Sequence, residues 1–219
     1  AVPGITVEIL NTSRYILKKD KNKIKEFINN TRSIHVDIIN ECIKNNIHKA
    51  KALQVVEILL KEMESVLNGL VLLAEVTEKA LDHLLSFGER LLTPIISYSL
   101  LDNGIDSVYL TGQEVGILTD SKYGQARPLM DTTKIRVKHN IDPLLKEKKI
   151  PVITGFIGAD QNGNTTTLGR SGSDYTATII AACIDADEVW LWTDVNGLMT
   201  ADPLIVKQAK VLREVSFAE

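Results

Sequence analysis

The sequence predicts an α/β fold with a largely parallel central sheet. In the second half of the chain, short apolar runs of β-type alternate with helical patterns, as in successive strand–helix units. In the first half, apolar residues recur at three- and four-residue steps from residue 14 to about 85, which predicts a helical subdomain. A length of 219 residues suits a single domain with one substantial core.

Composition narrows the function classes. The 25 Lys and Arg residues against 28 Asp and Glu give a net charge of −3, which offers no basic surface for nucleic acid. No stretch approaches the roughly 20 apolar residues of a membrane span. Cys42 and Cys183 lie in helix-like contexts, which favours buried thiols in a reducing compartment over a disulfide. The four histidines lack the spacing of metal ligands, so we assign no metal ligand. Charge, hydropathy and cysteine context together predict a cytoplasmic protein without nucleic-acid or membrane partners.

The first elements are helical. Apolar periodicity begins at Ile5, and after the long helical tract a further apolar helix runs to Asn103-Gly104, a typical stop. Glu89 stands at the expected start of that helix, where a carboxylate would favour the positive end of the helix dipole. On that interpretation, Glu89 needs no ligand to explain it.

From Ser107 the pattern changes to strands. Pro151 suits the first position of a buried strand, because that position need not donate to a neighbour. Asn162-Gly163 marks a hairpin-like turn. The expected order is strands at 108–110, 116–119 and 135–137, a short helix at 144–148, a strand at 150–157 and the turn at 160–164.

Residues 165–182 read as a strand, a glycine-containing turn and a helix. Gly172 allows close backbone approach, and Ser173 or Asp174 is the candidate N-cap. A helix start suits an anion, and Arg170 can bind a carboxylate or phosphate with two hydrogen bonds. Asp174 would repel a phosphate unless a metal ion lies between them. The combination is typical of phosphoryl transfer, although an ordinary turn with solvated Arg170 and Asp174 explains the pattern equally well.

A second polar group follows the apolar run 188–192. Such a run is typical of a buried parallel strand, and ligands gather where such strands end. Thr193 and Asp194 stand at that end.

Several motifs together resemble the aspartate kinases of the amino-acid kinase superfamily. The two longest are TTLGRSGSDYTA at 166–177 and WTDVNGLMTADP at 192–203, and shorter matches lie at 4–6, 87–90 and 155–158 in the same order. The resemblance implies a three-layer α/β/α amino-acid kinase-like fold, with residues 1–219 forming the catalytic domain and about 14–85 its helical subdomain. It also implies that an N-terminal strand with its lysine-containing phosphate loop, and C-terminal regulatory domains, are missing from these residues, so we expect the 219 residues alone to be inactive.

The same resemblance implies a function and a set of roles. The reaction would be ATP-dependent phosphorylation of the β-carboxylate of L-aspartate, with Mg²⁺, in a homo-oligomer such as a dimer. This is the first step of the biosynthesis of lysine, threonine and methionine from aspartate. The implied roles are substrate binding by Thr6, Glu89, Arg170 and Ser173, catalysis by Arg170 and Asp174, and nucleotide binding by Thr193, Asp194 and Met199.

The chain departs from the family pattern at three positions. Ser171 replaces a glycine, Met199 a tyrosine and Leu204 an arginine. Two other functions stay open, and the departures favour the second of them. One is another amino-acid kinase, acting on glutamate or N-acetylglutamate, and the other is a non-catalytic nucleotide- or amino-acid-binding module of the same fold.

Overall fold

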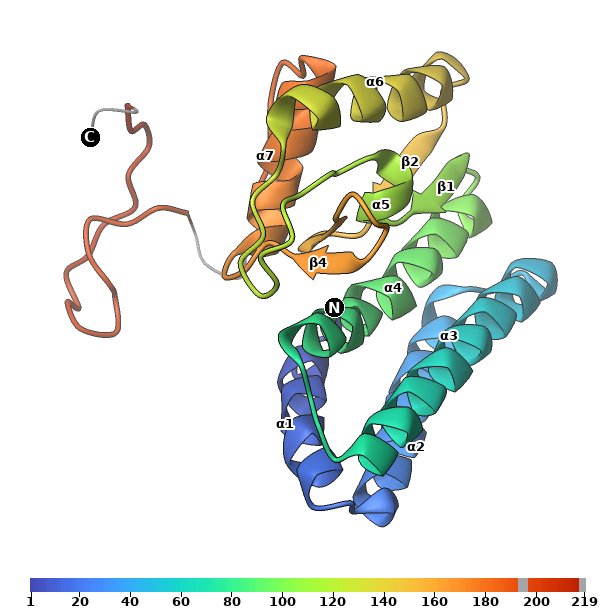
Figure 1. The fold of residues 1–219 in the computed structure, drawn as a ribbon. Helices are drawn as coiled ribbons and strands as arrows, with labels where there is room; N and C mark the ends of the chain where they lie inside the picture. The colour runs from blue at the N-terminus through green and yellow to red at the C-terminus, as the bar shows by residue number, and fades with distance from the viewer. Residues whose placement is uncertain (193–196, 217–219) are drawn as a thin grey trace. The chain divides into compact units, whose positions relative to one another are not determined.

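The computed structural model describes residues 1–192 and 197–216. The chain divides into two compact units, Ala1–Asp187 and Glu188–Glu219, and each is described by itself (Figure 1). The named helices and strands all belong to the first unit.

Four helices form the first half of this unit: α1 (Ile5–Leu17), α2 (Lys21–Cys42), α3 (Asn46–Leu73) and α4 (Glu78–Asp102). Short polar side chains begin three of them. The side chain of Asp20 accepts a hydrogen bond from the Lys23 amide, that of Asn45 from Ile47 and His48, and that of Thr77 from Ala80. The predicted apolar periodicity becomes a shared core, whose fully buried members include Ile9, Ile16, Ile28, Ile39, Leu60, Met63, Leu67, Leu84, Phe87 and Leu91.

Helix α4 differs from the prediction in where it begins. Thr77 caps it, so Glu89 lies well inside the helix and not at its positive end. The explanation of Glu89 by the helix dipole is therefore wrong. Gly88 lies inside the helix, where it packs closely against the N-terminal segment and α1. A Cβ there would lie 3.1 Å from the Ala1 Cβ and 3.5 Å from the Thr6 hydroxyl. Close packing decides this position, and helix propensity does not.

The second half of the first unit contains the strands. β1 (Ser107–Leu110) pairs in parallel with β2 (Ile150–Ile153), and β3 (Ile157–Ala159) pairs antiparallel with β4 (Thr165–Thr167). The turn between β3 and β4 closes through a hydrogen bond from the Gly163 amide to the Asp160 carbonyl, as the Asn-Gly dipeptide predicted. Three helices accompany the strands: α5 (Gly112–Val115), α6 (Met130–Lys146) and α7 (Gly172–Ile184).

The arrangement confirms the predicted α/β class. Figure 1 shows α4 on one side of the strands and α6 with α7 on the other, and α4 contacts β1, β2 and β4 while α6 contacts β2 and α7 contacts β3. A second core fills the space between the strands and the outer helices, and its buried members are Val115, Ile117, Val137, Ile141, Leu168, Ile179 and Cys183.

Three predicted strands of this unit differ from the structure. The run at 135–137 lies inside α6, because Thr133, Val137 and Ile141 are buried at four-residue spacing and this helical period outweighs a short β-type run. The run at 150–157 is two strands, since Gly155 and Phe156 interrupt it and Phe156 has a φ of 67°. The run at 116–119 makes isolated bridges only, from Leu118 to Ala159 and from Thr119 to Pro128.

The second unit lacks the strand that its apolar run predicted, as far as residues 188–192 are described. Trp190 is 71% exposed and Trp192 is 88% exposed, so hydrophobicity alone predicted a burial that this unit does not supply. Of the two free cysteines, Cys183 is buried as expected and Cys42 is exposed, against the expectation. Across the described parts of the chain, no helix is long and apolar enough to span a membrane.

Candidate functional site

A cavity of about 240 Å³ in the first unit brings together residues that are far apart in the sequence. It lies among the start of α1, the middle of α4 and the turn between β4 and α7. Four of its lining residues are predicted site residues, namely Thr6, Glu89, Ser173 and Asp174; the others are Phe156, Gly169, Ser171 and Gly172.

Thr6 and Glu89 reach the cavity because α1 and α4 touch at Gly88. Glu89 is half-buried, and its carboxylate Oε1 lies 2.7 Å from the ammonium nitrogen of Ala1. The side chain of Thr93 donates to the backbone carbonyl of Glu89. Apart from the Ala1 ammonium, no donor among the described residues contacts the Glu89 carboxylate. The cavity therefore has an acidic end, which the Glu89 carboxylate forms.

The opposite wall is the turn from Gly169 to Asp174. Gly169 has a φ of 78° and Ser171 a φ of 57°. A left-handed conformation costs a residue with a Cβ on the order of 1 kcal/mol, so Ser171 is strained where a glycine would not be. Ser171 is also the N-cap of α7, without a side-chain hydrogen bond, and the prediction of Ser173 or Asp174 as N-cap is wrong.

Two further glycines allow this turn to pack closely against the loop before β3. A Cβ on Gly172 would lie 2.6 Å from the Phe156 ring, and a Cβ on Gly155 would lie 2.8 Å from the Ser173 hydroxyl. Neither contact leaves room for a methyl group. The Phe156 amide donates to the Thr176 hydroxyl, which donates to the Gly172 carbonyl, so the loop before β3 and the start of α7 form one packed unit.

Arg170 lies in the same turn but outside the residues that line the cavity. Its side chain is exposed and has no ion-pair partner within residues 1–192 and 197–216. Asp174 is the exposed acid at the start of α7, beside backbone N–H groups of the first helical turn. The turn thus offers a guanidinium, helix-terminal amides and one carboxylate, which suits an anion accompanied by a cation.

The residues predicted to bind nucleotide do not line the cavity, as far as they are described. Thr193 and Asp194 lie outside the described residues. Met199 belongs to the second unit, where it pairs antiparallel with Val211. Within the described parts of the chain, no group of three or more His, Cys, Asp or Glu is arranged to hold a metal ion.

One buried acid escaped the sequence analysis. Asp82 of α4 is 1% exposed, and its carboxylate accepts hydrogen bonds from the amides of Gly124 and Thr167 and from the Thr167 hydroxyl. Burial raises the pKa of the Asp82 carboxyl, while these hydrogen bonds oppose the rise. A signal was present: Asp82 precedes the buried Leu85 and Ser86 by three and four residues, which places it on the inward face of the helix.

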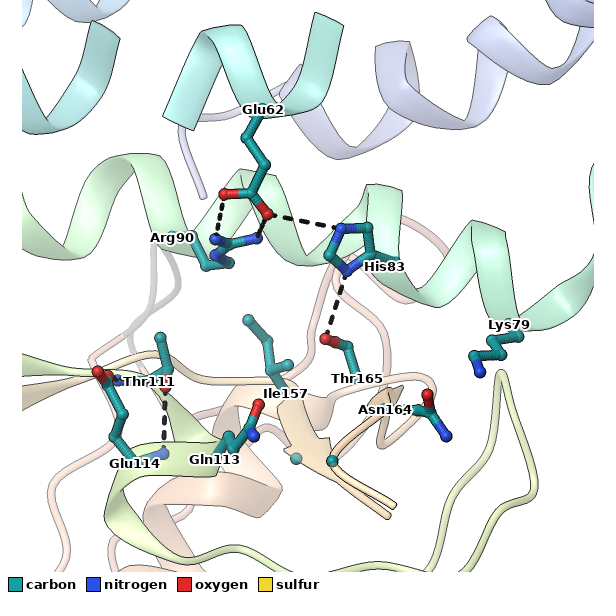
Figure 2. A pocket seen from close by; sticks show the side chains of 12 residues that line it. Glu62, Lys79, His83, Arg90, Thr111, Gln113, Glu114, Ile157, Asn164 and Thr165 are labelled. Atoms are coloured by element: carbon teal, nitrogen blue, oxygen red, sulfur yellow. Dashed lines mark hydrogen bonds and ion pairs between the residues drawn. The ribbon is translucent and has the colours of Figure 1, made fainter. Parts of the chain in front are cut away.

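A larger cavity of about 570 Å³ lies on another side of α4 and contains none of the predicted site residues (Figure 2). Three of its charged side chains, Glu62, Arg90 and Glu114, have partners, whereas Lys79 makes no hydrogen bond or ion pair with the described residues. Arg90 makes two hydrogen bonds to Glu62, of 3.0 and 2.7 Å, and the Glu114 carboxylate accepts from Thr111 at the start of α5. Burial lowers the pKa of His83, and the nearby Arg90 lowers it further. The predicted residues therefore favour the smaller cavity.

Known proteins resemble this chain along most of its length. An aspartate kinase of Pseudomonas putida is 39% identical over 168 residues, which are 74% of this chain and 39% of that protein. The crystal structure of E. coli aspartokinase III in complex with lysine and aspartate (T-state) matches with a TM-score of 0.84 and 28% identity, over 100% of this chain and 46% of that chain. The same enzyme in complex with aspartate and ADP (R-state) matches with a TM-score of 0.83 and 28% identity, over 97% and 45%.

The chain thus spans less than half of the length of these relatives. The family model described as the amino acid kinase family matches residues 11–219, nearly the whole of it. With the α/β fold and the glycine-rich turn at the start of α7, this match shows that the chain belongs to the amino acid kinase family.

Proposed function

We propose that the protein catalyses the ATP-dependent phosphorylation of the β-carboxylate of L-aspartate to 4-phospho-L-aspartate. The observation that carries the proposal is the cavity in which Glu89 faces the turn 169–174. An acid at one end and an arginine-bearing turn at the other suit a zwitterionic amino acid. The relatives named aspartate kinase, and the E. coli structures with bound aspartate, support aspartate as that amino acid.

Glu89 binds the α-ammonium group of the substrate in this proposal, and Arg170 binds the α-carboxylate with its two-pronged guanidinium. Thr6 and Ser173 donate hydroxyl hydrogen bonds. The place of the partly buried Glu89 side chain in the wall of the cavity supports the first role. Arg170 is exposed, so it would have to turn toward the cavity when a carboxylate enters it.

The reaction itself needs no enzyme nucleophile. An oxygen of the substrate β-carboxylate attacks the γ-phosphorus of ATP, the bond to the β-phosphate oxygen breaks, and ADP leaves. Both reactants are anions, so the protein must position them and neutralise charge. The backbone amides at the start of α7 and Arg170 provide positive charge, and Asp174 and the phosphates would hold Mg²⁺, which would offset the phosphate charge. Mg²⁺ typically takes only one or two carboxylates besides phosphates and water, which fits a single acid in the turn.

Among amino-acid substrates, the cavity favours a free α-amino group. N-acetylglutamate carries no ammonium, and its binding would leave Glu89 unpaired. A non-catalytic module of the same fold stays a second possibility, because Leu204 stands where the family resemblance implies an arginine and is 92% exposed. We further propose that the protein acts in the cytoplasm as a homo-oligomer such as a dimer, as the resemblance implies.

The test measures acyl phosphate by trapping it with hydroxylamine. The full-length protein is supplied with ATP and Mg²⁺, and with aspartate, glutamate or N-acetylaspartate in parallel. We expect aspartate hydroxamate, little product from glutamate and almost none from N-acetylaspartate, because leaving the half-buried Glu89 unpaired costs on the order of 2 kcal/mol. Comparable turnover of aspartate and N-acetylaspartate would refute the role of Glu89. No product from any of the three would favour the non-catalytic module.

A further inference from the structure

Helix α4 carries two acids on the same side. Asp82 and Glu89 are separated by about two turns of the helix, so their side chains leave it in nearly the same direction. Glu89 lines the cavity of the proposed substrate site. Asp82 does not line it and is 1% exposed. Any function of Asp82 therefore has to act through the residues that it contacts.

Those contacts join α4 to two other segments. The Thr167 amide donates to Asp82 Oδ2 at 2.9 Å, and the Thr167 hydroxyl donates to Oδ1 at 2.8 Å. The Gly124 amide donates to both oxygens, at 3.0 and 2.9 Å. Each carboxylate oxygen thus accepts two hydrogen bonds, which satisfies a buried carboxylate far better than a single partner would.

Both partners of Asp82 border the turn that forms the other wall of the cavity. Thr167 ends β4, and the next amide, that of Leu168, donates to the Phe156 carbonyl at 2.9 Å. Gly124 packs against the turn, since a Cβ on Gly169 would lie 3.4 Å from the Gly124 carbonyl oxygen. One carboxylate thus fixes the helix that carries Glu89 against the strand and the loop that support the turn 169–174.

We propose that Asp82 is a positioning residue, which sets the spacing between Glu89 and the turn 169–174. This inference rests on the proposed function, in which these two walls bind the ammonium and carboxylate groups of one amino acid. A zwitterion holds its two charged groups at a fixed separation. A change in the spacing of the walls therefore weakens binding even when every group that touches the substrate is intact.

Two substitutions separate the hydrogen bonds of Asp82 from its charge. In Asp82→Asn, the amide oxygen can accept from the Gly124 and Thr167 amides while the NH₂ group donates to the Thr167 hydroxyl, which can also accept. In Asp82→Ala, both backbone amides lose their partner inside the protein. Asparagine should preserve the spacing, and alanine should not.

The first experiment measures steady-state kinetics of the full-length protein. For Asp82→Ala we expect a KM for aspartate raised on the order of 10-fold or more, with the KM for ATP within about twofold, because misplacement by about 1 Å is enough for effects of this size. For Asp82→Asn we expect both KM values within about threefold of the unaltered protein. An unchanged KM for aspartate in a folded Asp82→Ala variant would overturn the inference.

A matched control separates spacing from stability. Ile39 of α2 is fully buried and lies outside the cavity, so Ile39→Ala should lower the melting temperature without raising the KM for aspartate. If Ile39→Ala raises this KM as much as Asp82→Ala does, Asp82 acts through stability alone and the inference is wrong. If Asp82→Ala does not fold, the double variant Asp82→Asn with Thr167→Val replaces it, because valine cannot accept the hydrogen bond of the asparagine.

Hydrogen–deuterium exchange gives a readout that does not depend on activity. Peptides that cover residues 165–175 should exchange faster in Asp82→Ala, and at nearly the original rate in Asp82→Asn. If the unaltered protein fails to phosphorylate aspartate, the proposed function fails, and faster exchange in this segment alone still supports the control of spacing by Asp82. Unchanged exchange in Asp82→Ala would overturn it.

Discussion

The Arg90 guanidinium and the Glu62 carboxylate form two parallel hydrogen bonds, of 3.0 and 2.7 Å, that join α4 to α3. Arg90 also lies 4.6 Å from the centre of the Phe87 ring. Its neighbour Glu89 faces the proposed substrate cavity. Adjacent residues on α4 therefore serve two different surfaces, one that holds the helices together and one that is open to a ligand.

Replacing Arg90 with lysine should weaken the link between α3 and α4. Lysine keeps the charge but loses the two-pronged geometry and the planar contact with Phe87. Both side chains of the pair are partly exposed, so we expect a loss of only about 1 kcal/mol in the free energy of unfolding. Chemical denaturation of Arg90→Lys, Glu62→Gln and the double variant measures the coupling. Strictly additive effects would contradict a direct interaction.

Two glycine substitutions should have opposite effects on stability. Gly172→Ala places a methyl group 2.6 Å from the Phe156 ring, which should lower the free energy of unfolding by about 1–3 kcal/mol. Gly69 lies inside α3, and a Cβ there meets nothing within 4 Å, so Gly69→Ala should raise it by up to about 1 kcal/mol. Thermal denaturation of the two variants checks the pair. A destabilised Gly69→Ala would mean that helix propensity does not decide this site.

The Asp160 carboxylate should make the free energy of unfolding depend on pH in the acidic range. Burial disfavours its ionised form, but hydrogen bonds from Asn164, Asn162 and Tyr123 outweigh burial and lower the pKa from 3.8 to about 2. A folded-state pKa below the unfolded value means that the stabilisation is present above pH 3.8 and is lost as the pH falls toward 2. Unfolding measured from pH 6 to pH 2 should therefore show a smaller acid-dependent loss in Asp160→Asn. Equal losses would assign the acid sensitivity to other groups.

The substitution Arg170→Lys tests the assignment of roles in the turn. Lysine cannot form the paired hydrogen bonds to a carboxylate, so we expect a clearly raised KM for aspartate with little change in the affinity for ATP. Steady-state kinetics with each substrate varied in turn measure both. A loss of ATP affinity instead would place Arg170 on the phosphate side of the reaction.

The sequence predicted the parts of this fold that depend on local patterns. Neighbouring residues predicted the helical periodicity of the first half, the strand at 108–110, the Asn-Gly turn and the presence of a helix after the glycine-containing turn, although not its N-cap. Gathering Thr6, Glu89 and Ser173 in one cavity needed the family resemblance, because no local signal brings distant segments together.

The errors came from features that local patterns do not contain. The run at 135–137 has a β-type composition, yet its place on α6 depends on which face packs against the strands. Helical spacing could place Asp82 on the inward face of α4, but it could not show the partners, Gly124 and Thr167, which are far away in the sequence. The apolar run 188–192 suggested burial, but a strand also needs a neighbouring strand to pair with.

The shared direction of Asp82 and Glu89 on α4 also limits how this segment can change in length. Each residue inserted between them would turn Glu89 by about 100° around the helix axis relative to Asp82 and shift it by about 1.5 Å. Point substitutions on the outer face of α4 do not change the angle between the two side chains around the helix axis, whereas a single insertion or deletion does. In homologous chains, the number of residues between the two acids should therefore be fixed even where the residues themselves vary.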